Sequence, residues 1–164
     1  MKSYSKKILN SLNLDIFKII SDASDDLKID TYVVGGFVRD LIINKTVKKD
    51  IDIMCVGSGI DLAKAVQEKI NPKAKVSIFK RYGTAMVTFN DYQVEFVGSR
   101  KESYSNDSRN PSVEAGNFMD DMLRRDFTIN TLAIRLNKNK FGELVDTFGG
   151  LKDLKKKIII TPSE

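Results

Sequence analysis

The sequence predicts an α/β protein, because strand and helix patterns alternate along its 164 residues. Residues 31–34 (TYVV) form a short β-rich run that ends at Gly35-Gly36, and residues 37–43 (FVRDLII) then show helical spacing. Residues 50–56 (DIDIMCV) alternate between polar and apolar side chains at first, as a strand does. A chain of this length forms about one domain and is long enough to bury a core.

The N-terminal part predicts one long helix. Apolar residues recur at spacings of three and four from Leu9 to Leu27, which is typical of an amphipathic helix of about five turns. We expect residues 1–30 to pack as a helix on a domain formed by residues 31–164.

Further elements follow the DIDIMCV strand. Residues 60–70 predict a second amphipathic helix that begins after a Gly-Ser-Gly segment. Three β-like segments come next, with Asn90-Asp91 as a hairpin turn between the last two: residues 74–79, 84–89 and 92–97.

The remaining third of the chain is less regular. Residues 99–116 are polar and almost devoid of core-forming side chains, which predicts a mobile functional loop. Residues 119–134 return to helical periodicity, residues 143–148 predict a short β-ribbon, and residues 151–157 predict a last helix.

Composition narrows the available chemistry. The chain has no histidine and a single cysteine, Cys55. Ser-His-Asp triads, Cys-His dyads, imidazole-ligated metals, cysteine zinc sites and an intrachain disulfide are therefore excluded. Carboxylates, lysines and tyrosines remain, and hard cations such as Mg²⁺ become the natural metals. The net charge of +5 is compatible with a polyanionic partner such as a nucleic acid or a nucleotide.

The sequence gives no sign of a membrane protein. No apolar run approaches membrane-spanning length, and the N-terminus lacks the apolar segment and cleavage site of a signal peptide. We therefore expect a cytoplasmic protein.

A pair of aspartates is the first candidate site. Asp50 and Asp52 are two residues apart in a predicted strand, so both carboxylates project from one face with their Cα atoms roughly 7 Å apart. They can converge on a shared divalent cation, or they can be the solvated face of an ordinary strand.

A possible phosphate cradle precedes the aspartates. Gly35 and Gly36 let the backbone approach an anion at the start of a helix, although a plain tight turn has the same sequence. Arg39, about one helical turn further, can reach the same anion or form a surface pair with Asp40. The combination favours a phosphate cradle beside a two-carboxylate magnesium site, as nucleotidyl transfer requires.

Charged residues further along add to this pattern. Glu95 is a third candidate acid on a predicted strand, and a surface glutamate is the alternative. Arg124 and Arg125 add positive charge near a triphosphate, or start a solvated helix with an internal salt bridge. The lysines between Lys152 and Lys157 either lie on a solvated helix face or bind an RNA backbone.

Three sequence blocks together resemble one family, the bacterial class II tRNA nucleotidyltransferases (CCA-adding enzymes) and poly(A) polymerases. The blocks are VVGGFVRDLI…KDIDIMC, YGTAMVTFNDYQVEFVGSRKESYSNDSRNPSVE and DDMLRRDFTINTLAI, and FGELVDTFGGLKDLKKK resembles the stretch that closes the head domain of that family. The resemblance covers residues 31–157.

The resemblance implies a nucleotidyltransferase head of the DNA polymerase β superfamily, with a small, mixed, mostly antiparallel sheet and helices on one side. It also implies the reaction: two-metal transfer of CMP and AMP from CTP and ATP to RNA 3′ ends, with tRNA as the acceptor, or of AMP alone by a poly(A) polymerase. A non-catalytic nucleotide- or RNA-binding module on the same fold is a further alternative.

The resemblance assigns roles residue by residue. It implies that Asp50 and Asp52 are the metal-binding catalytic carboxylates and that Glu95 is the third acid. Arg125 resembles a nucleotide-binding arginine of the family. Gly36 and Arg39 are implied to hold the incoming triphosphate, with Gly35 in the same turn. Residues 100–113 match the family's flexible stretch.

Departures from the family pattern spare the implied metal site. Thr131 stands where the family often has alanine, and Ile160 stands where an arginine is frequent. The neck that selects the base in this family would begin beyond Glu164, followed by the body and tail that grip tRNA. We therefore expect an isolated head that binds nucleotides only weakly.

Overall fold

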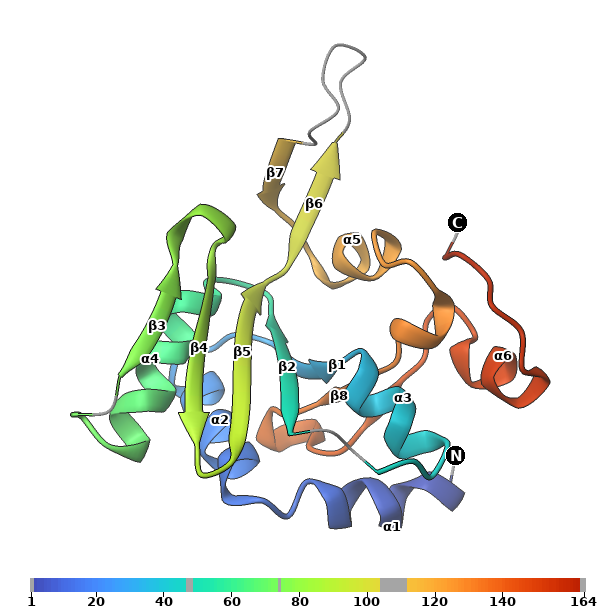
Figure 1. Ribbon diagram of the computed structural model, residues 1–164, viewed down its shortest axis with the longest axis horizontal. Coiled ribbons are helices and arrows are strands. Elements are labelled where there is room, and N and C mark those ends of the chain that lie inside the picture. The colour runs from blue at the N-terminus through green and yellow to red at the C-terminus, as the bar shows by residue number, and fades with distance from the viewer. Residues whose placement is uncertain (1, 47–48, 74, 104–111, 163–164) are drawn as a thin grey trace.

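The computed structural model describes residues 2–46, 49–73, 75–103 and 112–162. Seven strands form its main sheet in the order β3-β4-β5-β2-β1-β8-β9 (Figure 1). The strands are β1 (Thr31–Val34), β2 (Asp50–Cys55), β3 (Val76–Phe79), β4 (Thr84–Phe89), β5 (Tyr92–Gly98), β8 (Ala133–Arg135) and β9 (Leu144–Val145). Neighbours are antiparallel except β2 and β5, which are parallel. The predicted mixed, mostly antiparallel sheet is confirmed.

Helices cover one face of this sheet and enclose the main core. They are α1 (Lys2–Ser11), α2 (Asp15–Asp26), α3 (Gly36–Ile42) and α4 (Gly59–Ile70). The sheet contributes Ile51 and Ile53, each 1% exposed, and the rings of Phe17 and Phe37 meet edge to face at 5.6 Å. Burying one such isoleucine contributes about 1.5–3 kcal/mol, so the apolar side of β2 fixes which way its aspartates point.

The opposite face carries a smaller core under one short helix. Helix α5 (Phe118–Leu123) buries Met122 against Tyr32, Val34, Met54 and Ala133. The expectation of helices on one side only is therefore wrong at this point. The part of the face near Asp52 stays open, which leaves room for a ligand beside α5.

The predicted N-terminal helix of five turns is in fact two helices. Helix α1 ends at Ser11 and α2 begins at Asp15, with Leu14 extended between them. Asn13 favours a turn, and a carboxylate in the first turn of α2 suits the helix dipole. The apolar spacing runs through the break because both helices bury the same side, with Leu12 and Ile16 in one core.

The polar stretch 99–116 contains a β-ribbon, which the predicted structureless loop did not include. Strands β6 (Arg100–Ser103) and β7 (Ser112–Ala115) pair antiparallel and project away from the main sheet (Figure 1). The middle of the predicted mobile loop, residues 104–111, lies outside the described residues.

The helix predicted for residues 119–134 is correct only in its first five residues. Helix α5 ends at Leu123, a 3₁₀ turn spans Thr128–Asn130, and β8 then pairs with β1. Threonine and isoleucine at 128 and 129 disfavour a helix, and β8 gains a full hydrogen-bonded neighbour in the sheet. This turn carries Asn130 to the site described below.

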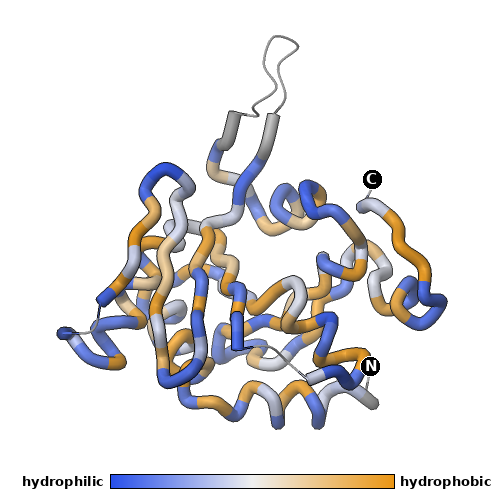
Figure 2. The backbone as a smooth tube through the Cα atoms, in the orientation of Figure 1, coloured by the Kyte–Doolittle hydropathy of each residue, from blue (hydrophilic) through white to orange (hydrophobic). Residues whose placement is uncertain are grey.

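The other predicted elements are confirmed: β1, α3, β2, α4 and the three strands β3 to β5. Asn90 sits in the hairpin turn with φ of +52°. The last helix, α6 (Gly150–Lys156), is followed by an apolar run at the surface, in which Ile159 is 66% exposed (Figure 2). No helix in the described part of the chain is long and apolar enough to cross a membrane.

Candidate active site

Two neighbouring strands place three carboxylates on one face of the sheet. Asp50 and Asp52 alternate with the buried Ile51 and Ile53 on β2, as their spacing predicts. On the parallel neighbour β5, Glu95 is the register partner of Asp52. Partners on adjacent strands share a face and lie about 5 Å apart, so Glu95 joins the aspartates as its sequence position suggested.

The glycine turn lies directly beside Asp52. Val34, the last residue of β1, pairs with Asp52, and Gly35 follows with φ of +71°. A Cβ built on Gly35 would lie 3.6 Å from Asp52 Oδ2 and 3.5 Å from Arg125 Nη1. One built on Gly36 would lie 3.5 Å from Arg39 Nη2. Both glycines thus keep space free between backbone and charged groups, as a phosphate cradle needs.

The Arg39 side chain, which lies beside this space, is held by two partners. Its Nε and Nη2 atoms contact Asp40 Oδ1 at 2.9 and 2.8 Å, so the predicted alternative, a pair with Asp40, is present. Its Nη1 donates to Asn130 Oδ1 at 2.9 Å. The side chain remains 30% exposed, and it is oriented by these contacts from α3 toward the 3₁₀ turn.

Arg125 is anchored more deeply. Its Nη2 contacts Asp121 Oδ2 at 3.0 Å, and its Nη1 donates to the carbonyl oxygen of Asn130 at 3.3 Å. Asn130 therefore joins both arginines, through its side chain to Arg39 and through its backbone to Arg125. Among the described residues, the buried Nε of Arg125 has no hydrogen-bond partner.

Asp121 is a fully buried acid that pairs with both Arg124 and Arg125. Its carboxylate also accepts from Arg124 Nε and Nη2, at 2.9 and 2.6 Å. Sequence reasoning missed both Asp121 and Asn130. A signal existed for Asp121, because it precedes the two arginines by three and four residues in a helical stretch. The salt bridge expected for that segment was a solvated one, whereas the structure has a bridge to a buried acid.

A cavity of about 230 Å³ lies on the open face of the sheet, beside the groups described above. Of the predicted site residues, Asp52, Glu95 and Arg125 line it, together with Asp121, Arg124 and Arg100. Gly35 is not a lining residue, but it lies next to Asp52 and Arg125, which are. Asp50, Gly36 and Arg39 are not part of its lining, and they flank it on the same strand and on α3.

The electrostatics of the cavity centre on Asp52. Burial raises the pKa of this carboxyl above its usual range, and the nearby charges of Glu95 and Asp50 raise it further, while Arg125 opposes them. Asp52 is nevertheless exposed to solvent as a residue, so water screens part of the repulsion. A cation between the carboxylates would relieve the remainder.

The donor set suits a divalent cation that keeps part of its hydration shell. Within the described ranges, no three acidic or cysteine side chains are arranged to enclose a metal by themselves. Mg²⁺ usually binds through one or two carboxylates plus waters and substrate phosphates. Asp52 at an open cavity, with Asp50 two residues away on β2 and glycines and arginines nearby, fits that kind of site.

Comparisons with known proteins agree with this geometry. Residues 31–160 match the family described as the poly A polymerase head domain. The chain is 41% identical over 128 residues to the A-adding tRNA nucleotidyltransferase of Aquifex aeolicus, covering 78% of this chain and 15% of that protein. It is 34% identical over 132 residues to the CC-adding tRNA nucleotidyltransferase of Deinococcus radiodurans, covering 76% of this chain and 33% of that protein.

Solved structures show the same fold. A CCA-adding enzyme in its apo form II superposes with a TM-score of 0.85 and 31% identity, over 96% of this chain and 38% of that one. A tRNA nucleotidyltransferase complexed with a primer tRNA and an incoming ATP analog superposes with a TM-score of 0.75 and 34% identity, over 87% and 38%. The chain thus spans well under half the length of these relatives, and within that span it belongs to the poly A polymerase head domain family, together with the tRNA nucleotidyltransferases.

Proposed function

We propose that this chain carries the nucleotidyl-transfer site of an enzyme that adds CMP and AMP to tRNA 3′ ends, using CTP, ATP and Mg²⁺. Residues 31–164 form the head in this proposal, and residues 1–30 form a helical part packed on it. The observation that carries the proposal is the pairing of Asp52 with Glu95 in a cavity that also receives Arg125. Relatives that add A, CC and CCA to tRNA support it.

In this proposal Asp50 and Asp52 hold the metal, and Glu95 adds a third negative charge at the same place. A Mg²⁺ ion held by these aspartates would supply the charge that lowers the pKa of the RNA 3′ hydroxyl and neutralises the triphosphate. Burial is the main cause of the raised pKa of Asp52, and the charges of Glu95 and Asp50 add to it. A cation bound beside these carboxylates would relieve that mutual repulsion, which supports this role.

In this proposal the triphosphate is held by Gly35, Gly36, Arg39 and Arg125. The left-handed turn at Gly35 leaves no side chain between backbone and phosphate, and the two guanidinium groups supply charge and hydrogen bonds. Asn130 orients both arginines, so their positions are set before the nucleotide arrives.

Calorimetric binding of ATP and CTP to the chain tests the metal and nucleotide parts. We expect weak binding that requires Mg²⁺, and we expect Asp50→Ala and Asp52→Ala to lose the metal dependence. Asp15→Ala, which removes an exposed carboxylate on α2, is the matched control and should bind like the unmodified chain. Equal ATP affinity in Mg²⁺ and in EDTA would contradict the proposal.

The acceptor and the nucleotide choice need a second assay. Labelled CTP and ATP are supplied in competition to a tRNA that lacks its CCA end, with Asp52→Ala as the negative control. Incorporation of CMP before AMP supports CCA addition, and incorporation of AMP alone into any RNA end supports the poly(A) alternative.

A further inference from the structure

A groove continues from the candidate active site to the outer edge of the sheet. A second cavity, of about 420 Å³, shares Thr84, Glu95 and Arg100 with the first one. A third, of about 430 Å³, shares Tyr82 and Arg100 with the second. We call the second and third cavities together the edge groove. It starts at Glu95 on β5, passes β4 and the 3₁₀ turn after β3, and reaches the start of α4.

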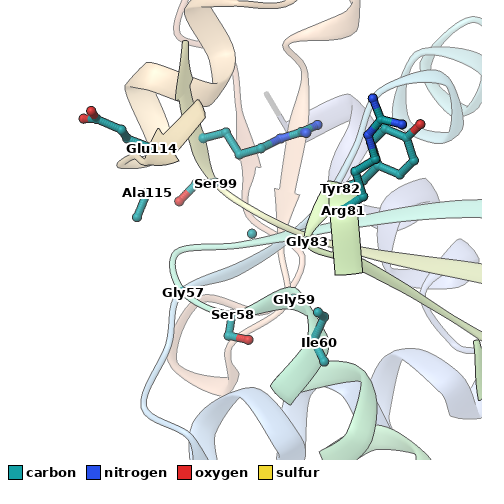
Figure 3. Close-up of a pocket in the computed structure, with 12 residues that line it drawn as sticks. Gly57, Ser58, Gly59, Ile60, Arg81, Tyr82, Gly83, Ser99, Glu114 and Ala115 are labelled. Atoms are coloured by element: carbon teal, nitrogen blue, oxygen red, sulfur yellow. The ribbon is translucent and has the colours of Figure 1, made fainter. Parts of the chain in front are cut away.

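Aromatic and basic side chains both line the edge groove. Phe79 is 45% exposed and Tyr82 is 59% exposed, so neither ring is used by the core. The Arg81 guanidinium carbon lies 5.8 Å from the centre of the Tyr82 ring. Figure 3 shows Arg81 and Tyr82 on one side of the third cavity and Glu114 on the other.

Arg100 lies where the three cavities meet. Its Nε is buried and has no hydrogen-bond partner among the described residues, which is costly unless a ligand or water supplies one. Its backbone N–H donates to Oδ1 of the buried Asp121 at 3.4 Å. Asp121 also pairs with Arg124 and Arg125, so β6 is connected to these two arginines through a shared partner. A phosphate oxygen is a suitable acceptor for this guanidinium.

This composition suits single-stranded nucleic acid. Proteins bind such strands with aromatic rings that stack on bases and with cations that follow the phosphates. The acid at the inner end, Glu95, belongs to the catalytic cluster, and Glu114 stands at the outer end. Between them the wall presents the rings of Phe79 and Tyr82 and the charges of Arg81 and Arg100.

The sheet order places the glycine turn and the edge groove on opposite sides of β2. The glycine turn and Arg39 follow β1, on one side of β2, and the edge groove starts on β5, on the other side. In phosphoryl transfer the attacking and leaving oxygens lie roughly in line. If the cradle on the β1 side holds the pyrophosphate that leaves, the attacking 3′ hydroxyl comes from the β5 side.

We propose that the edge groove binds the last nucleotides of the RNA acceptor strand, with a base on Tyr82 and backbone phosphates at Arg81 and Arg100. This inference rests on the proposed function, because the in-line argument needs the nucleotide to occupy the cradle. The groove delivers the 3′ hydroxyl past Glu95 to the space beside Asp52.

Fluorescence anisotropy with a 5′-labelled single-stranded RNA of about ten nucleotides, a length within the usual site sizes, tests the groove without nucleotide or metal. Tyr82→Ala and Arg100→Ala should each weaken binding about tenfold, the loss expected for one stacked base or one charged contact. Tyr82→Phe keeps the ring and should restore most of the affinity. Arg81→Ala should lower the salt dependence by about 0.7 in log–log slope.

Lys6→Ala is the matched control, because it removes an exposed positive charge from α1 on the helix-covered side of the sheet. It should leave RNA binding within about twofold, as expected for one charge far from the strand. An RNA with 4-thiouridine one nucleotide before its 3′ end should crosslink to the segment that contains Phe79 and Tyr82.

Two results would overturn the inference: groove variants that bind RNA as Lys6→Ala does, or crosslinks that map away from the groove. Magnesium-dependent ATP binding by the unmodified chain is measured in parallel. If ATP binds and the groove variants behave like the control, only the groove assignment fails. If ATP does not bind, the proposed function fails, whatever the RNA result.

Discussion

Gly35 and Asp52 lie against each other across the β1–β2 pair, so that a Cβ on the glycine would come within 3.6 Å of the Asp52 carboxylate. The same Cβ would come within 3.5 Å of Arg125 Nη1. The backbone at Gly35 therefore faces both the Asp52 carboxylate and the Arg125 guanidinium. A side chain there enters the space that a phosphate would share with a cation.

Gly35→Ala should damage both the fold and the site. With φ of +71° and ψ of −136°, alanine is strained by about 1–3 kcal/mol, and its methyl group lies between Asp52 and Arg125. We expect a lower melting temperature and at least a tenfold loss of magnesium-dependent ATP affinity, the effect of about 1.4 kcal/mol.

Gly149→Ala separates these two effects. Gly149 also has a positive φ, of +74°, and a Cβ there would meet nothing within 4 Å. This variant should lose stability and keep its ATP affinity. If Gly35→Ala binds ATP as Gly149→Ala does, the turn has no role in binding.

Asp52 should make the metal-free chain less stable as its carboxyl ionises. Its pKa lies above the ordinary value because of burial and the charges of Glu95 and Asp50. Between the ordinary and the raised pKa, the folded state binds more protons than the unfolded state, so the free energy of unfolding falls as pH rises through that window. Above the window the penalty is complete.

Asp52→Asn removes this penalty and should melt about 1–2 °C higher than the unmodified chain at neutral pH in EDTA, a small effect because water screens the exposed part. The difference should vanish below the ordinary pKa. Adding Mg²⁺ should raise the melting temperature of the unmodified chain and not of the variant. A variant that melts lower than the parent in EDTA at neutral pH would contradict this account.

The sequence predicted the centre of the fold well because local rules govern it. Strict alternation around Asp50 and Asp52 sets β2, since Ile51 and Ile53 can be buried only on the other face. The glycine turn and α3 follow from glycine's freedom and from helical spacing. The break between α1 and α2 was missed, because two helices that bury the same side continue a single periodic pattern.

Contacts between segments that are distant in the chain could not be predicted from the sequence. The bond from Arg39 to Asn130 joins residues 91 positions apart, and it exists only because a 3₁₀ turn replaces the expected helix after α5. The ribbon formed by β6 and β7 lies in a mostly polar stretch, so hydrophobic patterning gave little indication of its strands. The alignment of Glu95 with Asp52 needed the parallel pairing of β2 and β5, which no local pattern specifies.

Asn130→Ala should weaken nucleotide binding without a large loss of stability. The substitution removes the acceptor of Arg39 and keeps the backbone carbonyl that holds Arg125. We expect ATP affinity to fall about tenfold, the value of one hydrogen bond to a charged group. Asn139→Ala, at an exposed asparagine in the next turn, should change nothing.

A double-mutant cycle with Arg39→Ala shows whether Asn130 acts through the arginine. If it does, the double variant should bind ATP no more weakly than Arg39→Ala alone, because the acceptor has no further role once its donor is gone. Fully additive losses would instead place Asn130 in direct contact with the nucleotide.

Asp121→Ala should be the most destabilising of these substitutions. Its carboxylate is fully buried and pairs with both Arg124 and Arg125, whose side chains are only 21% and 18% exposed. Removing one partner of a buried ion pair costs about 3–5 kcal/mol, because the remaining charges stay desolvated. Urea unfolding should show this loss directly.

Asp126→Ala provides the contrast, since Asp126 is an exposed acid in the same segment and its loss should stay within about 0.5 kcal/mol. Asp121→Asn keeps the shape and one acceptor and should fall between the two. The same order should hold for magnesium-dependent ATP affinity, because Arg125 reaches the cavity only while Asp121 holds it. If Asp121→Asn lost stability and kept full ATP affinity, the arginine would not depend on its buried partner for position.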